Sequence, residues 1–481
     1  MPTIPPSTTP PPADLPLRGD RTTFSIRVDS YVTWFSTCWA EIIALVTNCY
    51  NNAVEAYNNA AAALASANAA SASAATAAAT ANAAMWISGH AYAQGECAIS
   101  AVDFETYRRK TEGSGVIDPS SDSANWVSIV KSAVAKLVQG RNVVVNGDCS
   151  ISQINGTTLI TPVNGGYSLD NVHWVLSVAS KLQAQQVTNV LNSLGATHAE
   201  TVSVLSSYMP AASDSFFKDY PIEGINFARF FYGSANARPG SLQFKARALV
   251  AGTYSGAIQN YAQTRSFPFS FVLAANTDTI VKIENIPGDT GGVWVGPTNT
   301  GAARIVFDHG SGPNLKGAAG AWVGGNIVGV TGAVSLVSQA NGSTLTITDV
   351  QFEESEFCTQ FERKLKDQNL IESMRYYEQT WNEGTAPASG NYPGLIRGNS
   401  PISDPSSIQG FGFRVEKRTT PTLVFYNPVT GVSGQVYREN DASTIAVTGY
   451  QYTGNRGVGS IQIALPLNMS YLYHCAASAR I

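Results

Sequence analysis

Charge is scarce in this sequence. Lys, Arg, Asp and Glu make up 13% of the 481 residues, about half of the usual share, and the formal net charge is −4. No block of basic residues occurs, which argues against nucleic acid as a partner. Small polar and β-branched residues replace the charged ones, a composition that favours a rigid, β-rich protein over a disordered one. The length predicts about three or four domains.

Catalytic and metal-binding motifs are also missing. The six cysteines show no CxxC spacing, and the five histidines show no metal-ligand spacing. There is no GxSxG elbow, and the Gly-rich segment 310–317 lacks the GK[ST] ending of a phosphate loop. Glu353, Glu354 and Glu356 lie too close together to be a glycosidase pair, and we interpret them as a solvated edge. We therefore predict no catalytic residues and no enzymatic activity.

No stretch predicts export or a membrane span. The first twenty residues, MPTIPPSTTPPPADLPLRGD, lack a basic region followed by an apolar one, so no signal peptide is expected. The apolar stretch WFSTCWAEIIALV is short and contains Glu41. We expect no membrane insertion, free cysteines that are buried, and synthesis in a reducing cytoplasm.

The N-terminal part of the chain carries the strongest pattern. Residues 1–21 are rich in proline and predict an extended arm. Residues 22–85 predict a coiled-coil stalk, because apolar residues recur at alternate spacings of four and three. Its second half, ALASANAASASAATAAATANAA at 63–84, is a strong helix former without Gly or Pro. The seam consists of Phe24, Val28, Tyr31, Phe35, Cys38, Ile42, Leu45, Cys49, Asn52 and Asn59.

Two arrangements of this helix remain open. It can fold back on a domain of its own chain, or it can pack against copies of itself. The alanine-rich half favours several chains, because a single helix with so few large apolar side chains buries little surface against a globular core. Asn52 and Asn59 lie on the seam, where a polar residue can fix the register and the number of chains.

The rest of the chain predicts mainly β structure. Short β-like runs between turns predict a small β module at 86–126, followed by a linker helix at 127–140. Regular short strands at 141–362 predict a β-sandwich of the jelly-roll type. Residues 363–382 have a helical period, and 383–481 return to strands as a C-terminal β-rich tip. No repeat of fixed period occurs, which argues against a β-helix.

Two sets of side chains are candidate ligand contacts. The rings of Trp86, Tyr107 and Trp126 can form a platform for a sugar, although they can equally fill the core of a small module. Asp148 follows the first predicted jelly-roll strand and Asp349 lies in the last, and two carboxylates with backbone carbonyls suit Ca²⁺. We expect no other cofactor.

Several stretches resemble parts of tailed-bacteriophage tail fibres and related virion receptor-binding proteins. The opening PPSTTPPPADLPLRGDRTTFSIRVDSYVTWF is similar to the segments by which such fibres attach to the tail. The stretch from 85 to 126 resembles a small carbohydrate-binding module, apart from Cys97 at a usual Val position. Its pattern of Trp, Tyr, Gly, Tyr, Pro and Trp is matched here by Trp86, Tyr92, Gly95, Tyr107, Pro119 and Trp126.

The most specific match lies in the predicted jelly roll. NVVVNGDCSISQ and YSLDNVHWVL are similar to the opening strands of phage-fibre jelly rolls, with His173 in place of a usual Arg. The closing strand and helix of those domains are matched by Val350 to Glu353, Phe361 to Arg363 and Arg375 to Tyr377. The final strands, including YHCAASARI, are similar to the tips that follow such domains.

The resemblance covers most of the chain and implies a function. It implies a homotrimeric virion fibre with a trimeric coiled-coil stalk, whose residues 1–21 dock on tail or portal-proximal proteins. Its distal β domains are expected to bind a host surface polysaccharide without cleaving it. Two alternatives stay open: a collar or connector fibre that binds only virion proteins, and a glycan depolymerase, although such enzymes are usually long β-helices.

Overall fold

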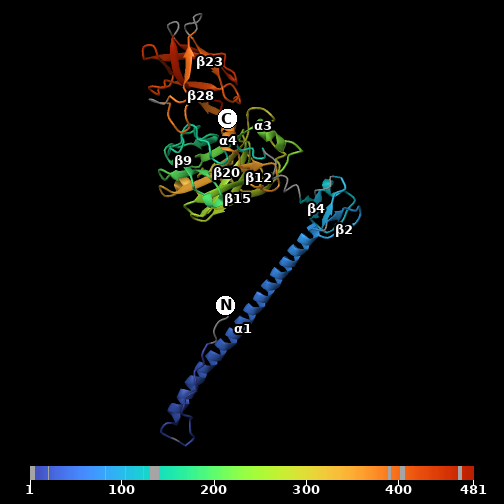
Figure 1. Cartoon of the computed structure of the whole chain (residues 1–481). Helices are drawn as coiled ribbons and strands as arrows, with labels where there is room; N and C mark the ends of the chain where they lie inside the picture. Colours follow the sequence, from blue (N-terminus) through green and yellow to red (C-terminus); the bar gives the residue numbers. More distant parts are fainter. Residues whose placement is uncertain are drawn as a thin grey trace. The chain divides into compact units, whose positions relative to one another are not determined.

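The computed structural model describes residues 6–19, 21–81, 83–102, 105–122, 124–129, 140–387, 392–400, 407–463 and 469–481. The chain divides into two compact units, Met1–Ala135 and Lys136–Ile481. The first contains helix α1 (Phe24–Ala81) and a small β module, and the second contains a β-sandwich and a C-terminal β domain (Figure 1). This confirms a mainly β protein with one long N-terminal helix. None of the described helices is long and apolar enough to cross a membrane.

Helix α1 is continuous over 58 residues (Figure 1), which corresponds to about 87 Å at 1.5 Å per residue. The predicted stalk was 22–85. The helix begins two residues after the predicted start and ends four residues before the predicted end. Its seam side chains are exposed or half-exposed within this chain, and Phe35 is 66% exposed. The helix is therefore confirmed, and its assembly into a trimer stays a prediction.

The Pro-rich arm lies along one side of α1 without regular secondary structure. The Trp34 indole Nε1 donates to the carbonyl of Thr9 at 2.9 Å, and the Thr9 N–H donates to the Glu41 carboxylate at 2.6 Å. The guanidinium of Arg27 donates to an arm carbonyl at 3.2 Å. Arg27, Trp34 and Glu41 are seven residues apart, so they form one stripe of the helix next to the predicted seam.

The small β module contains a four-stranded sheet of order β1-β3-β4-β6 and the pair β2-β5. Tyr92, Ala98, Tyr107 and Trp126 form its core, and Trp86 packs against them. Its strands are β1 (Ala84–Met85), β2 (Ala91–Tyr92), β3 (Cys97–Ile99), β4 (Thr106–Arg109), β5 (Gly113–Ser114) and β6 (Trp126–Ser128). Strand β6 takes up 127–128, where we expected the linker helix to begin, and residues 130–139 of that prediction lie outside the described residues.

Two antiparallel sheets form the sandwich. The five-stranded sheet has the order β15-β12-β20-β10-β9, and the seven-stranded sheet has the order β18-β14-β13-β16-β11-β8-β7. The first consists of β9 (Leu182–Thr188), β10 (His198–Val204), β12 (Gly240–Ala248), β15 (Thr279–Ile286) and β20 (Thr344–Glu353). The second consists of β7 (Tyr167–Leu169), β8 (Val172–Leu176), β11 (Phe216–Glu223), β13 (Gly252–Asn260), β14 (Arg265–Leu273), β16 (Gly301–Asp308) and β18 (Val323–Gly324).

One hydrophobic cluster joins the two sheets. Val202, Phe244 and Ile347 of the first sheet pack in the same core as Tyr220 and Ile305 of the second. Behind the seven-stranded sheet, a second cluster forms where the segment 309–334 covers Phe217, Ala257 and Val306. That segment contains the parallel pair β17 (Lys316–Gly317) and β19 (Gly329–Val330). The central strands β11, β13 and β16 are thus covered on both faces, which explains why every residue of β11 is buried.

The prediction that NVVVNGDCSISQ forms the opening strand of the sandwich is wrong. Residues 141–153 form turns and irregular backbone instead of a strand. Within them, a Cβ atom on Gly147 would lie 2.1 Å from the carbonyl oxygen of Val350, so only glycine fits at this point. Asn146 and Cys149 have left-handed backbone, with φ of 57° each. The backbone at Gly147 thus lies directly against β20 where we expected a paired strand. This contact explains the glycine of the NGD motif.

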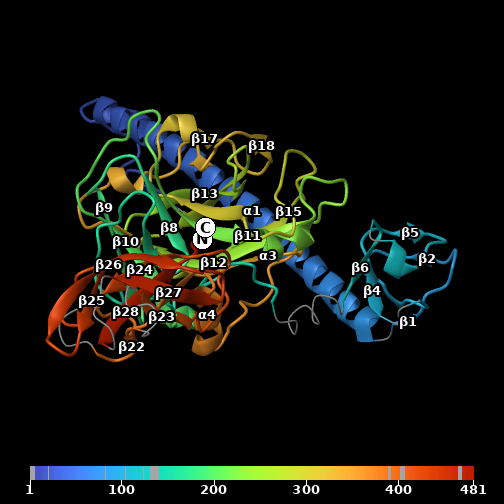
Figure 2. The ribbon, with the colours of Figure 1, turned by 90° about the horizontal axis from the view of Figure 1, so that it is seen from above.

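The C-terminal domain is built around one long strand, β28 (Ser470–Ser478), which pairs with β21, β22, β24 and β25 (Figure 2). The other strands are β21 (Tyr377–Gln379), β22 (Ile396–Asn399), β23 (Ser407–Gly412), β24 (Thr422–Tyr426), β25 (Gln435–Arg438), β26 (Ser443–Gln451) and β27 (Gly457–Ile463). Among the described residues of the second unit, the α-helices are α3 (Gly224–Phe227) in the sandwich and α4 (Lys366–Met374) after it. We expected a helix over 363–382, but β21 occupies 377–379 because it pairs with β28.

Buried polar contacts join the sandwich to the C-terminal domain. The Gln153 side-chain amide donates to the Tyr377 carbonyl, and the Gln379 amide donates back to the Gln153 carbonyl, both at 2.8 Å. Glu223 accepts two hydrogen bonds from Arg375, at 2.9 and 2.6 Å. These contacts connect the two β domains within one compact unit.

Candidate functional site

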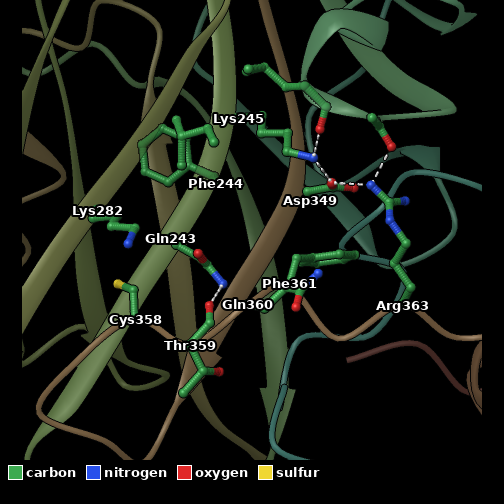
Figure 3. Close-up of a pocket in the computed structure, with 13 residues that line it drawn as sticks. Gln243, Phe244, Lys245, Lys282, Asp349, Cys358, Thr359, Gln360, Phe361 and Arg363 are labelled. Carbon is green, nitrogen blue, oxygen red and sulfur yellow. Dashed lines mark hydrogen bonds and ion pairs between the residues drawn. The ribbon is translucent and has the colours of Figure 1, made fainter. Parts of the chain in front are cut away.

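A pocket of about 590 Å³ lies on the outer face of the five-stranded sheet (Figure 3). Strands β12 and β20 form its floor, β15 forms one side, and the loop between β9 and β10 and the segment after β20 complete the rim. The side chains of β12 alternate between the core and this face, so Gln243 and Lys245 point away from the core that holds Leu242 and Phe244.

A backbone irregularity in β20 positions the acidic group of the pocket. Opposite β20, the register of β12 shifts between Gln243 and Lys245, which pair with Gln351 and Thr348. Two residues of β20 therefore face one residue of β12, which is a β-bulge. Asp349 lies in this bulge with φ of 52°, a left-handed conformation that is uncommon for a residue other than glycine. Such strain is often found at functional sites.

Two cations share the carboxylate of Asp349 (Figure 3). The Lys245 Nζ lies 2.6 Å from Asp349 Oδ2 and donates to the carbonyl of Leu194 at 2.6 Å. The Arg363 Nη2 lies 3.0 Å from the same Oδ2 and also donates to the carbonyl of Gly195. Burial raises the pKa of the Asp349 carboxyl, although both cations act to lower it. The charges of this cluster therefore sum to at least one positive unit.

Uncharged groups complete the lining of the pocket. The Gln243 amide donates to the carbonyl of Thr359, and the Cys358 thiol donates to the carbonyl of Leu242 at 3.4 Å. Burial raises the pKa of the Cys358 thiol to about 12, so it adds no charge at neutral pH. The ring of Phe361 lies below the guanidinium of Arg363, with 5.6 Å between the ring centroid and Cζ. Amides, the Phe361 ring and cations thus surround a single hollow, and Phe244 of its floor also belongs to the core.

The predicted solvated acidic edge is only partly solvated. Glu353 is 3% exposed, and its carboxylate accepts hydrogen bonds from the backbone N–H and the hydroxyl of Thr359 at 2.7 and 2.9 Å. It therefore holds the segment that forms one wall of the pocket. Glu354 pairs with Arg238, and Glu356 is exposed. These carboxylates have separate partners and do not form a facing pair.

The three aromatic residues predicted to bind a sugar lie in the core of the small β module. Tyr107 is 3% exposed and Trp126 is 2% exposed, and Trp86 packs against both of them. The Arg109 guanidinium covers the Trp126 ring at 5.1 Å. In this conformation Tyr107 and Trp126 offer no open ring face, so their positions favour the core-filling alternative.

The two aspartates predicted to bind calcium have protein donors as partners. Asp148 Oδ1 accepts from the Ser150 hydroxyl at 2.9 Å, and its Oδ2 accepts from the Asn369 amide at 2.8 Å. Asp349 has the cation partners given above. Within the described ranges, no group of three His, Cys, Asp or Glu side chains could hold a metal ion. Calcium binding stays a prediction without further support.

Sequence reasoning did not single out most of the pocket. Gln243, Lys245 and Arg247 alternate with apolar residues in SLQFKARA, and this alternation was the one available signal for the floor of the pocket. Arg363 was noted only as part of the Phe-Glu-x-Arg resemblance. Lys282 carried no signal, because nothing in its local sequence shows that the fold brings it near residue 363.

No protein-family model matches this sequence, and no curated protein matches it. Among solved structures, the chain is similar to the enzymatically active domain of tailspike protein 4 of bacteriophage CBA120, at 13% identity, over 44% of this chain and 21% of that one, with a TM-score of 0.25. A putative sugar-binding protein from Bacteroides thetaiotaomicron is 12% identical over 44% of this chain and 100% of that one, with a TM-score of 0.26. A family 11 carbohydrate-binding module from Clostridium thermocellum is 9% identical over 40% and 95%, with a TM-score of 0.22. The chain thus spans about a fifth of the tailspike domain, and similarity at these scores does not assign it to a family.

Proposed function

We propose that this chain is a non-enzymatic fibre protein of a bacteriophage particle that binds a glycan on the host cell surface. The pocket on the five-stranded sheet is the observation that carries the proposal. Its amides, charged groups and the Phe361 ring match the mixture of hydroxyl groups and C–H faces that a sugar presents. A few placed polar groups in a preformed hollow are typical of ligand sites.

The N-terminal unit supports the fibre part of the proposal. Helix α1 exposes large apolar side chains of the predicted seam, among them Phe35 at 66% and Ile42 at 43%. A single chain in water rarely leaves so much apolar surface open, whereas a coiled coil of three chains would cover it. Three copies of a weak site would then bind a cell surface together through their effective concentration. Residues 1–21 would attach the fibre to tail or portal-proximal proteins.

Binding of the labelled full-length protein to intact candidate host bacteria tests the proposal. Ile280 lines the pocket and is 51% exposed, so Ile280→Trp would fill the hollow without removing a charge. Val272→Trp is the matched control, because Val272 is an apolar strand residue of the other sheet and is 71% exposed. Periodate oxidation of the cells destroys surface sugars and provides the second arm.

The proposal predicts that Ile280→Trp and periodate treatment both abolish binding and that Val272→Trp leaves it unchanged. Binding that survives Ile280→Trp would place the receptor site elsewhere in the chain. No binding to any tested cell would contradict the adhesive function and favour a connector fibre. Release of oligosaccharide during the incubation would contradict the non-enzymatic part and favour a depolymerase.

A further inference from the structure

The charge of the pocket differs in sign from that of the whole chain. The chain has a formal net charge of −4. The pocket is lined by Lys245, Lys282 and Arg363 but by a single carboxylate, that of Asp349. The lining therefore carries a net charge of about two positive units, opposite in sign to the net charge of the whole chain.

The positive groups are the accessible ones. The Asp349 side chain is 2% exposed and lies at the back of the pocket, whereas the side chain of Arg363 is 46% exposed. Lys282 is exposed, and no ion pair or hydrogen bond joins its ammonium to another described residue. Among the charged groups that line the pocket, Arg363 and Lys282 are therefore the accessible ones. The exposed Glu284 carboxylate is outside this lining, although it accepts from the backbone N–H of Cys358 at 3.0 Å.

The guanidinium of Arg363 is held in place before a ligand arrives. Its Nη2 is fixed by Asp349 and by the carbonyl of Gly195, and its plane lies over the Phe361 ring. The remaining guanidinium nitrogens have no hydrogen-bond partner among the described residues. A planar donor that is already oriented loses little entropy on binding a carboxylate, and this geometry favours two parallel hydrogen bonds.

Another hollow in the same unit lacks these properties. It has a volume of about 220 Å³ and is lined mainly by small residues such as Gly310, Gly312 and Ser335. Its one cation is Lys316, whose ammonium lies 3.3 Å from the carboxylate of Asp308. Of these two hollows, the larger one therefore has the excess of positive charge.

We propose that the pocket selects an acidic saccharide, in which a carboxylate on a sugar ring binds the guanidinium of Arg363, while Lys282 adds positive charge on the opposite side of the pocket (Figure 3). This inference rests on the proposed function and adds the chemical class of the glycan. The Gln243 amide and the Phe361 ring then contact the uncharged part of the sugar. A simple polyanion would use the cations alone, and a neutral glycan would leave them unpaired.

The test compares acidic polysaccharides with their own carboxyl-reduced forms. The probes are polygalacturonate, alginate, hyaluronate and polysialic acid, each before and after reduction of its carboxylates to alcohols, with polyglutamate as a polyanion without sugar. Binding to the full-length protein is measured by calorimetry at low and high salt. The variants are Lys282→Gln and Arg363→Gln, and Lys181→Gln is the matched control because Lys181 does not line the pocket.

We expect at least one acidic polymer to bind and its reduced form to bind about ten- to a hundredfold more weakly, which is typical for the loss of a charged hydrogen-bond partner. Arg363→Gln should lose a similar factor, Lys282→Gln a smaller one, and the control none. Equal binding of native and reduced polymers, or tight binding of polyglutamate, would overturn the acidic-saccharide inference. Failure of every acidic polymer would also overturn it. Sugar-dependent binding to host cells that Ile280→Trp abolishes would still support the proposed function in each case.

Discussion

Helix α1 and the β-sandwich differ in which side chains they expose and which they bury. The helix exposes large apolar groups, such as Phe35 at 66% and Trp39 at 60%, whereas the sandwich encloses Lys218 and Glu200 completely, at 0% each. In the sandwich, the buried ammonium and carboxylate of these two residues form an ion pair, and Glu200 also accepts from the Ser168 hydroxyl. The sandwich thus pairs these two buried charges within one chain, whereas the helix leaves large apolar side chains uncovered. From this difference we expect, as the proposed function does, that the helix packs against partner chains.

The largest expected effect tests the requirement for partners. Ile42→Ser with Leu45→Ser alters two seam positions, whereas Ile43→Ser with Val46→Ser alters two neighbouring positions off the seam. Ile42 and Ile43 are similarly exposed in one chain, at 43% and 52%. If three helices pack along the seam, each seam substitution costs about 2–5 kcal/mol per chain, as in other large-to-small core changes. Sedimentation equilibrium should show three chains for the natural protein and the off-seam variant, and one chain for the seam variant.

A single-chain mass for the natural protein would contradict the trimeric stalk directly. Equal masses for the two double variants would leave an oligomer but refute the seam that the heptad pattern predicts.

The next effect concerns the buried ion pair of the sandwich. Lys218→Met leaves the Glu200 carboxylate buried without its cation, which typically costs about 3–5 kcal/mol of unfolding free energy. Arg238→Met is the control, because the pair of Arg238 with Glu354 is exposed and such pairs contribute about 1 kcal/mol or less. Urea unfolding, followed by hydrogen exchange in the sandwich strands, measures both. The double variant Lys218→Met with Glu200→Leu should recover most of the loss, and a Lys218→Met loss as small as the control would refute the argument.

The small β module of the first unit, unlike helix α1, buries its aromatic side chains within one chain. Trp126 is 2% exposed, so Trp126→Ala should destabilise the module by about 3–5 kcal/mol, as expected for a buried aromatic residue. Trp86 only packs against the edge of this core, so Trp86→Ala should cost less. Hydrogen exchange of the module amides measures the difference. Loss of cell binding by Trp126→Ala with normal exchange protection would instead support the sugar platform predicted from the sequence.

Periodic patterns could be read from the sequence, and tertiary contacts could not. The heptad spacing predicts α1 to within a few residues because a helix depends on local periodicity. The helix expected at 363–382 was wrong after Arg375, since pairing with β28 outweighs the local helical pattern around Tyr377. The pocket was not predicted as a site, because Lys282 and Arg363 line one hollow only after β15 and the segment after β20 are in place. Burial of Trp126 likewise depends on packing that composition does not reveal.

A pH effect of intermediate size is expected where the sandwich meets the C-terminal domain. Asp170 is 2% exposed, and burial raises its pKa to about 6, against the lowering by Arg480 and by hydrogen bonds from Gln153. Between about pH 4 and pH 6 the folded state therefore holds a proton that the unfolded state has lost, so this group makes the protein less stable as the pH rises. The unfolding free energy should fall by about 3 kcal/mol in total across this range, given the raised pKa of the folded state.

The variant Asp170→Asn isolates this contribution. It should reduce the fall in stability between pH 4 and pH 6, whatever its effect on stability at one pH. Urea unfolding at several pH values gives the two slopes, and identical slopes would show that Asp170 ionises normally in the folded state.

The smallest effect concerns the arm that contacts α1 within its own chain. Hydrogen bonds from the hydroxyl and the backbone N–H of Thr9 lower the pKa of the Glu41 carboxyl. Because the ionised carboxylate is the acceptor, docking of the arm should persist above the usual pKa of a glutamate and be lost as the pH falls through the lowered value. Glu41→Gln should speed hydrogen exchange at Thr9 without changing global unfolding, and Glu55→Gln, further along the helix, should do neither. If Glu41→Gln also changes the number of chains in the assembly, the arm and the seam are coupled, and the exposed helix is regulated by its own N-terminus. If the number of chains stays the same, the arm is an independent attachment element, as the proposed function requires.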